Sequence, residues 1–158
     1  MFPDKRLFQV FVYGTLKKGE PNHHWLTNKD NGFARFECKG TTEKKFPLLI
    51  ATKYNIPFLL DNAPDTGHNI CGEVYSVDET MFKNLDELED YPELYDRNVF
   101  NVNGLDGNSH QCWIYLLKKY PDEFLKKERF ISEYKDSVEK PYCENYLDTC
   151  TPEDLYNS

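Results

Sequence analysis

The sequence predicts a single α+β domain, residues 1–158, built mainly of β-strands. At 158 residues, one domain buries enough surface to hold a core without disulfides or metal. Aromatic residues make up 15% of the chain, which excludes low-aromatic acidic disorder. Most apolar segments have the length and the β-branched and aromatic content of strands, and no repeat, linker or low-complexity segment divides the chain.

Four strands and one short helix are predicted in the first half of the chain. The strands cover residues 7–13, 33–42, 46–50 and 70–77. The first of them stops at Gly14 and is apolar enough to be a buried strand. A short helix is expected over residues 21–26, and a polar turn at residues 43–45 separates the second strand from the third. Pro57 interrupts the apolar run 56–60, so this run cannot take a central position in a sheet.

The hydrophobic periodicity changes after the fourth strand. Asp78 can cap a helix whose apolar residues recur at helical spacing and which should end before Pro92. Residues 98–102 and 112–117 are then expected to pair as a hairpin around a turn at residues 104–108.

The C-terminal region and the overall charge indicate a solvated acidic surface. A helix is expected over residues 122–135, and residues 139–158 are expected to form a peripheral tail. The 19 Lys and Arg against 27 Asp and Glu give a formal net charge of −8, and the whole excess lies in the second half. No basic run supports nucleic-acid binding. No apolar run approaches the roughly 20 residues that a membrane helix needs.

Cysteine usage and motif content favour a cytoplasmic protein without a metal or an organic cofactor. The five Cys are widely spaced and form no CxxC pair; Cys143 and Cys150 could pair, but free thiols are the expected state in a reduced cytosol. No phosphate-binding glycine loop, serine nucleophile elbow or zinc-protease motif occurs. The adjacent His23 and His24 cannot face one metal ion from either a helix or a strand.

The first candidate functional feature is the loop that follows the first strand, Tyr13-Gly14-Thr15-Leu16. A strand that stops at glycine can turn successive backbone N–H groups into one concavity, which suits a carboxylate or a developing oxyanion. For this segment alone, an ordinary tight turn is the commoner interpretation.

The second candidate is Glu89, which follows Leu85 by four residues on the expected helix. Its carboxylate then lies on or beside the apolar stripe, where burial raises a carboxyl pKa and suits it to general base catalysis near neutrality. On periodicity alone, a glutamate that reaches water from the edge of the stripe is the commoner interpretation. The neighbouring acidic residues are predicted to point toward solvent: Asp86, Glu87 and Asp90.

Together these features resemble the γ-glutamylcyclotransferase superfamily, and within it the γ-glutamylamine cyclotransferase (AIG2-like) group. The matching segments are residues 10–19, 21–23, 46–50, 55–60 and 72–75, with Leu85-Asp86 followed by Glu89, Tyr95 and Arg97. The match fades after about residue 118. One departure is Asp90, because many relatives have glycine directly after the corresponding glutamate.

This resemblance implies a small, mostly antiparallel β-barrel flanked by short helices, and a reaction that releases a γ-glutamyl group as 5-oxoproline. The substrate's α-amine attacks its own γ-carbonyl and expels an amine. The resemblance assigns substrate binding to Tyr13, Gly14, Thr15 and Leu16, and catalysis to Glu89. One carboxyl group can serve both proton transfers, since the attacking ammonium must lose a proton and the leaving amine must gain one. The nucleophile belongs to the substrate, so neither metal nor cofactor is expected.

Three functions remain as alternatives at this point. The first is cyclisation of γ-glutamyl-amines such as γ-glutamyl-ε-lysine, which the segments 21–23 and 56–58 favour. The second is the same reaction on γ-glutamyl-α-amino acids or glutathione, and the third is a catalytically idle binding module. In each case the expected partner is a small molecule, bound by a monomer. Pro57 is expected either to shape a pocket wall as a rigid bend, for which a cis peptide is one option, or to be an ordinary edge or loop proline.

Overall fold

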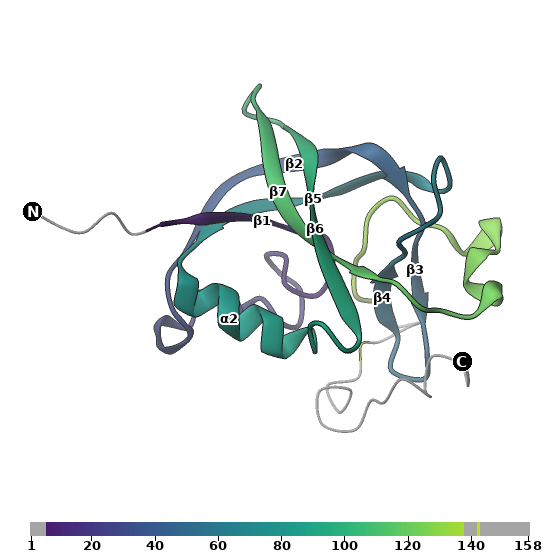
Figure 1. The fold of residues 1–158 in the computed structure, drawn as a ribbon, viewed down its shortest axis with the longest axis horizontal. Helices are drawn as coiled ribbons and strands as arrows, with labels where there is room; N and C mark the ends of the chain where they lie inside the picture. Colours follow the sequence, from purple (N-terminus) through teal and green to yellow (C-terminus); the bar gives the residue numbers. More distant parts are fainter. Residues whose placement is uncertain (1–5, 138–141, 143–158) are drawn as a thin grey trace, which may run out of the picture.

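Five strands close into a barrel in the computed structural model, which describes residues 6–137 and 142. They are β1 (Phe8–Val12), β5 (His68–Val77), β2 (Ala34–Phe46), β6 (Tyr95–Gly104) and β7 (Ser109–Leu117), in that spatial order. Neighbouring strands are antiparallel except β7 and β1, whose parallel contact at Val10 and Trp113 closes the barrel. Figure 1 shows this arrangement. The mostly antiparallel barrel is therefore confirmed.

Both faces of the barrel wall are buried along much of its length. Alternate residues of β1 belong to two different apolar clusters, with Phe11 in one and Val10 and Val12 in the other. The Val10 cluster includes Met81 and Leu85 of the helix α2 (Glu79–Leu88), so it lies between the barrel and this helix. Since side chains alternate across a strand, the Phe11 cluster fills the barrel interior.

A second, two-stranded sheet packs beside the barrel. It pairs β3 (Leu48–Ala51) with β4 (Ile56–Leu59), and Pro57 stands opposite Ile50. A parallel bridge from Leu60 to Leu117 joins this sheet to β7. The proline is accommodated because the sheet has only two strands, as expected for a strand with an edge available.

The turn predicted at residues 43–45 is wrong. β2 runs through these residues, and Lys45 and Phe46 pair with Asn69 and His68 of β5 after an irregularity in the register. The Asn69 side chain also donates to the carbonyl oxygens of Thr42 and Glu43. The side chains of Glu43, Lys44 and Lys45 are all exposed along this part of the strand.

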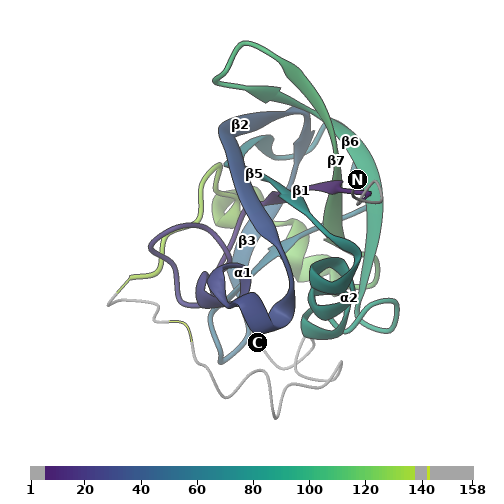
Figure 2. The same ribbon diagram turned by 90° about the vertical axis from the view of Figure 1, so that its left-hand side faces the viewer.

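The expected central helix is present with its expected cap. The Asp78 side chain accepts hydrogen bonds from the N–H groups of Met81 (2.9 Å) and Phe33 (3.0 Å), and α2 ends before Pro92. In Figure 2, α2 lies at the end of the barrel opposite the turn between β6 and β7. The expected hairpin is likewise formed by β6 and β7. The first helix, α1 (His24–Thr27), is shorter than expected.

The helix predicted over residues 122–135 is wrong. This region forms two short 3-10 helices instead, η2 (Asp122–Leu125) and η3 (Lys127–Arg129). Another 3-10 helix, η1 (Lys29–Asn31), follows α1 near the start of the chain. The chain then extends so that Ile131 bridges to Leu48 and Tyr134 is buried in the core. These two contacts require an extended backbone, which a continuous helix would prevent. The tail predicted at residues 139–158 lies outside the described residues, except for Tyr142.

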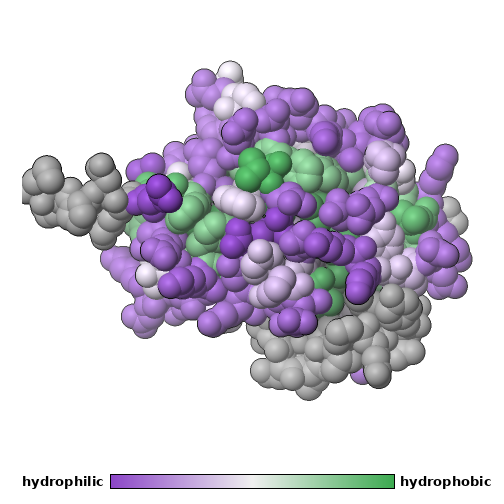
Figure 3. All heavy atoms as spheres, in the orientation of Figure 1, coloured by the Kyte–Doolittle hydropathy of each residue, from purple (hydrophilic) through white to green (hydrophobic). Residues whose placement is uncertain are grey.

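The surface carries few apolar areas on the face drawn in Figure 3, where hydrophilic residues predominate. None of the helices among the described residues has the length and apolar character needed to span a membrane.

Candidate active site

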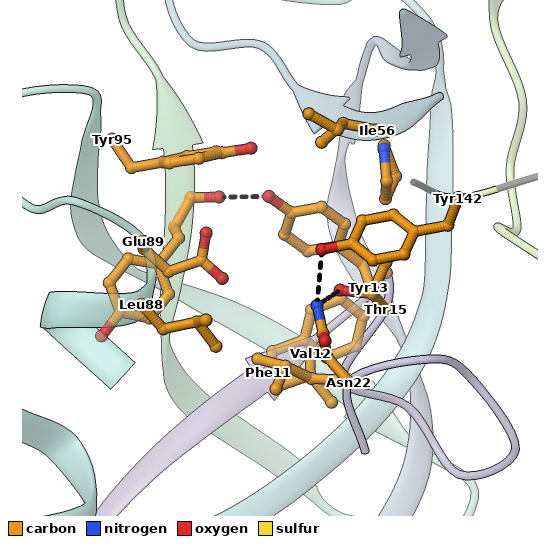
Figure 4. Close-up of a pocket in the computed structure, with 14 residues that line it drawn as sticks. Phe11, Val12, Tyr13, Thr15, Asn22, Ile56, Leu88, Glu89, Tyr95 and Tyr142 are labelled. Carbon is orange, nitrogen blue, oxygen red and sulfur yellow. Dashed lines mark hydrogen bonds between the residues drawn. The ribbon is translucent and has the colours of Figure 1, made fainter. Parts of the chain in front are cut away.

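A pocket opens where β1 ends, between the C-terminal end of α2 and the β3–β4 sheet. Its walls come from residues 11–16 and Asn22, Ile56 and Pro57 of β4, Leu88 and Glu89 at the end of α2, Tyr95 and Tyr115 of the hairpin, and Tyr142. The structure thus brings together all five residues that the sequence singled out. Glu89 lies more than 70 positions from the other four in the sequence. Figure 4 shows most of these side chains.

The loop after β1 is shaped by a close approach between Gly14 and Pro57. A Cβ atom on Gly14 would lie 2.8 Å from Cγ of Pro57, so this position needs glycine for space. The turn uses two loop carbonyls as acceptors: Gly14 O receives the N–H of Lys17 (3.2 Å) and Thr15 O that of Asn22 (2.8 Å). Among the described residues, the N–H groups of residues 14–16 take no part in these bonds.

Pro57 therefore forms one wall of the pocket, as the first of its two interpretations proposed. The cis peptide of that interpretation is wrong: among the described residues, the cis bond is Tyr91–Pro92.

Glu89 is the residue at which α2 ends. Its N–H donates to the carbonyl of Leu85 (2.9 Å) and so completes the last helical turn. The carboxylate points into the pocket between Tyr95 and Leu88, facing Tyr13 (Figure 4). Burial, and then the negative charge of Asp86, raise the pKa of Glu89 to about 8. A carboxyl group with this pKa can both take up and release a proton near neutral pH.

Asp86 does not point to solvent as predicted. Arg97 of β6 holds its carboxylate through two hydrogen bonds, from Nε (2.9 Å) and Nη2 (3.2 Å), and the Tyr115 hydroxyl donates a third (2.7 Å). The Arg97 guanidinium is itself stacked over aromatic rings, those of Phe82, Tyr91 and Trp113. The helix periodicity could not reveal this, because the partners come from β6 and β7.

Asp90 is exposed, as predicted, and its backbone conformation is one that suits glycine. Its φ of 52° lies in the left-handed region that follows many helix ends. Glycine adopts this region freely, and aspartate is among the few other residues that visit it. Asp86, and not Asp90, is the carboxylate that acts on the pKa of Glu89.

Tyrosine hydroxyls and one amide complete the walls. The Tyr13 hydroxyl donates to the Tyr115 carbonyl (2.9 Å), and burial raises its pKa well above the ordinary value, so it stays protonated. The Asn22 amide donates to Thr15 Oγ1 (3.0 Å) and to the Tyr142 hydroxyl (3.0 Å).

Sequence reasoning did not assign a role to four of these side chains: Asn22, Tyr95, Tyr115 and Tyr142. Asn22 and Tyr95 lie within segments that carry the family resemblance, which was a usable signal. Tyr142 lies beyond the region where the resemblance fades, and no local pattern marks it.

The chain is similar to known proteins along most of its length. Residues 10–136 match the family described as gamma-glutamyl cyclotransferase, AIG2-like. A Drosophila melanogaster protein provisionally named gamma-glutamylcyclotransferase CG2811 is 54% identical over 146 residues, 92% of each chain. A Mus musculus gamma-glutamylaminecyclotransferase is 43% identical over 123 residues, 73% of this chain and 82% of that one. The crystal structure of an AIG2-like protein from Mus musculus superposes with a TM-score of 0.80 at 37% identity, covering 88% of this chain and 96% of that chain.

Proposed function

The chain belongs to the AIG2-like γ-glutamyl cyclotransferase family, and from this premise we propose that it converts γ-glutamyl-amines, such as γ-glutamyl-ε-lysine, to 5-oxoproline and the free amine. One observation carries the proposal. The Glu89 carboxyl group, with its pKa raised to about 8, faces the loop of residues 13–16 across a single pocket.

Glu89 is the proton carrier in this mechanism. It accepts a proton from the substrate's α-ammonium group, and the resulting amine attacks the γ-carbonyl carbon. The new C–N bond closes the lactam ring, and the bond to the leaving amine breaks as Glu89 returns the proton to that nitrogen. The ring nitrogen also loses a second proton, which the same carboxyl group passes to the released amine, so the products are a neutral lactam and an ammonium group. Glu89 ends in its starting state, and no other acid or base is required.

The loop of residues 13–16 holds the substrate in the folded conformation that cyclisation needs. N–H groups of residues 14–16 are placed to bind the γ-carbonyl oxygen or the α-carboxylate, and either bond favours the reactive geometry. The rigid contact between Gly14 and Pro57 keeps this loop in place.

The proposal includes no metal and no organic cofactor, since the substrate supplies its own nucleophile. The partner is a small molecule, with no role for nucleic acid or membrane. The proposal also includes action as a monomer. Cys38, Cys71 and Cys112 are free thiols, which supports a reduced, cytoplasmic location.

A substrate panel tests this function. The purified protein is incubated with γ-glutamyl-ε-lysine, a γ-glutamyl-α-amino acid and glutathione, and 5-oxoproline is measured. We expect the highest kcat/KM with γ-glutamyl-ε-lysine. A preference for either of the other two would support the cyclisation reaction but reject γ-glutamyl-amines as the preferred substrates. Binding of these compounds without any 5-oxoproline would identify an idle binding module and reject the enzyme.

A further inference from the structure

Three potential metal ligands converge at the end of the barrel opposite the pocket. They are Cys38 of β2, Asp106 in the turn between β6 and β7, and His110 of β7, and their ligand atoms all lie within 4.8 Å of one another. Figure 1 places this turn at the top of the molecule and α2 at the bottom. None of the three lines the pocket that contains Glu89.

The barrel itself fixes this cluster. β2 pairs with β6 at Gly40 and Gly104, and the Leu105 N–H donates to the Lys39 carbonyl (2.8 Å), which holds the turn beside Cys38. The turn also orients Asp106, because the Asn108 N–H donates to its Oδ1 atom (2.9 Å). The second oxygen, Oδ2, is left facing His110 at 2.9 Å.

Gly104 keeps the space among the three residues open. A Cβ atom at this position would clash with Oδ1 of Asp106, lie 2.9 Å from Sγ of Cys38 and lie 3.1 Å from Cδ2 of His110. Gly104 does not adopt the left-handed backbone that would by itself call for glycine. The glycine is thus explained by the space between the three side chains.

The contacts of His110 place its Nε2 atom between an oxygen and a sulfur atom that can both bind a metal ion. Its Nδ1 atom faces Oε1 of Gln9 (3.3 Å), and its Nε2 atom faces both Oδ2 of Asp106 (2.9 Å) and Sγ of Cys38 (3.6 Å). A neutral imidazole has a single N–H. With that proton on Nδ1, toward Gln9, the Nε2 lone pair points at a carboxylate and a sulfur. Metal-bound histidines have this arrangement, in which the other ring nitrogen donates to an oxygen.

We propose that Cys38, Asp106 and His110 bind one Zn²⁺ ion, with water as the fourth ligand. Tetrahedral bonds of about 2.3 Å to sulfur and about 2.05 Å to nitrogen separate these two atoms by about 3.6 Å, which is the distance between Sγ of Cys38 and Nε2 of His110. The same geometry requires about 3.3 Å between nitrogen and oxygen. The Asp106 carboxylate therefore withdraws by about 0.4 Å from its present 2.9 Å, which its exposed turn permits.

Charge and protons balance when the ion binds. Binding displaces the proton of the Cys38 thiol to solvent, so that thiolate and carboxylate together neutralise the divalent ion. The ion links β2 to the β6–β7 turn and leaves the pocket untouched. Its role is structural, and the proposed catalytic cycle runs without it.

Cobalt substitution tests the site directly, because Co²⁺ reports both its ligands and its coordination number. The full chain is stripped with EDTA, reduced, and titrated with Co²⁺ and then with Zn²⁺. We expect one Co²⁺ per chain, with a thiolate-to-cobalt charge-transfer band and the visible bands of four-coordinate cobalt, both bleached by Zn²⁺. Absence of the charge-transfer band overturns the proposal and leaves His110 and Asp106 as an ordinary ion pair.

Matched variants locate the binding. Cys38→Ser should abolish the charge-transfer band, whereas Cys71→Ser, which removes a thiol outside the cluster, should keep it. Gly104→Ala retains all three ligands but fills the space between them, so it should weaken Zn²⁺ binding at least tenfold. Circular dichroism checks that each variant is folded. A band that survives Cys38→Ser in a folded protein overturns the assignment, as does a change in 5-oxoproline formation when the wild-type metal is removed.

Discussion

Replacing Glu89 by Gln tests both the catalytic role of this half-buried carboxyl group and its effect on stability. The substitution keeps the size of the side chain and removes its ability to accept and return a proton. We expect kcat for 5-oxoproline formation to fall by about 10²–10⁴-fold, the range typical of general acid–base groups. In the wild-type protein, kcat/KM should rise with pH through about 8, the pKa at which Glu89 is half ionised, and then level off.

The same variant should be more stable than the wild type, by an amount that depends on pH. The pKa of Glu89 rises from 4.5 to about 8 on folding. Well below pH 4.5, Glu89 is protonated in both the folded and the unfolded protein, and no stability is lost. Between the two values the folded state must hold a proton that the unfolded state releases, so stability falls as pH rises. At 1.36 kcal/mol per pKa unit, the loss is about 3 kcal/mol at pH 7. Gln carries no charge and avoids this loss.

Urea unfolding at pH 5, 7 and 8 measures this difference, with Glu87→Gln as the control because Glu87 is exposed. The stability gap between Glu89→Gln and wild type should widen from pH 5 to pH 8, while that of the control stays flat. A gap independent of pH would refute the raised pKa. Near-normal turnover in Glu89→Gln would refute its role as the proton carrier.

Three further substitutions address the walls of the pocket and the helix end. Gly14→Ala should lower kcat/KM at least tenfold, because its methyl group meets the ring of Pro57; unchanged kinetics would show that the loop moves without cost. Tyr142→Phe removes the hydroxyl that accepts from Asn22 and should raise KM several-fold while kcat stays within about twofold; an unchanged KM would exclude Tyr142 from substrate binding. Asp90→Gly should raise the free energy of unfolding by about 0.5–1 kcal/mol, because glycine adopts a φ of 52° more easily; thermal unfolding measures this, and a destabilised variant would contradict it.

Local sequence signals predicted the elements whose cause is local. Asp78 caps α2 because its side chain reaches the N–H group of Met81 three residues later, and a sequence window contains that whole interaction. The strand that ends at Gly14 was predictable for the same reason. Glu89 could be placed on the correct side of the helix by counting from Leu85, although its burial depends on the distant residues that form the rest of the pocket.

Long-range interactions explain what the sequence could not predict. The turn expected at residues 43–45 is a strand because β5 pairs alongside it, and the helix expected over 122–135 is replaced by a segment whose Ile131 pairs with Leu48. Asp86 was expected to face solvent because helix periodicity carries no information about Arg97, its partner on β6. The cluster of Cys38, Asp106 and His110 likewise joins two distant regions of the chain. Their separation in the sequence matches no metal-binding motif.

The contribution of Tyr142 has a consequence for the order in which the molecule is made. The last barrel strand ends at Leu117, so every strand of the barrel is synthesised before Tyr142. The Asn22 amide lacks its hydrogen bond to the Tyr142 hydroxyl, 120 positions further along the chain, until that residue has been added. The barrel can thus form before the pocket is complete. A protein cut after residue 137 should keep its strands but lack Tyr142, which lines the pocket and belongs to an apolar core cluster.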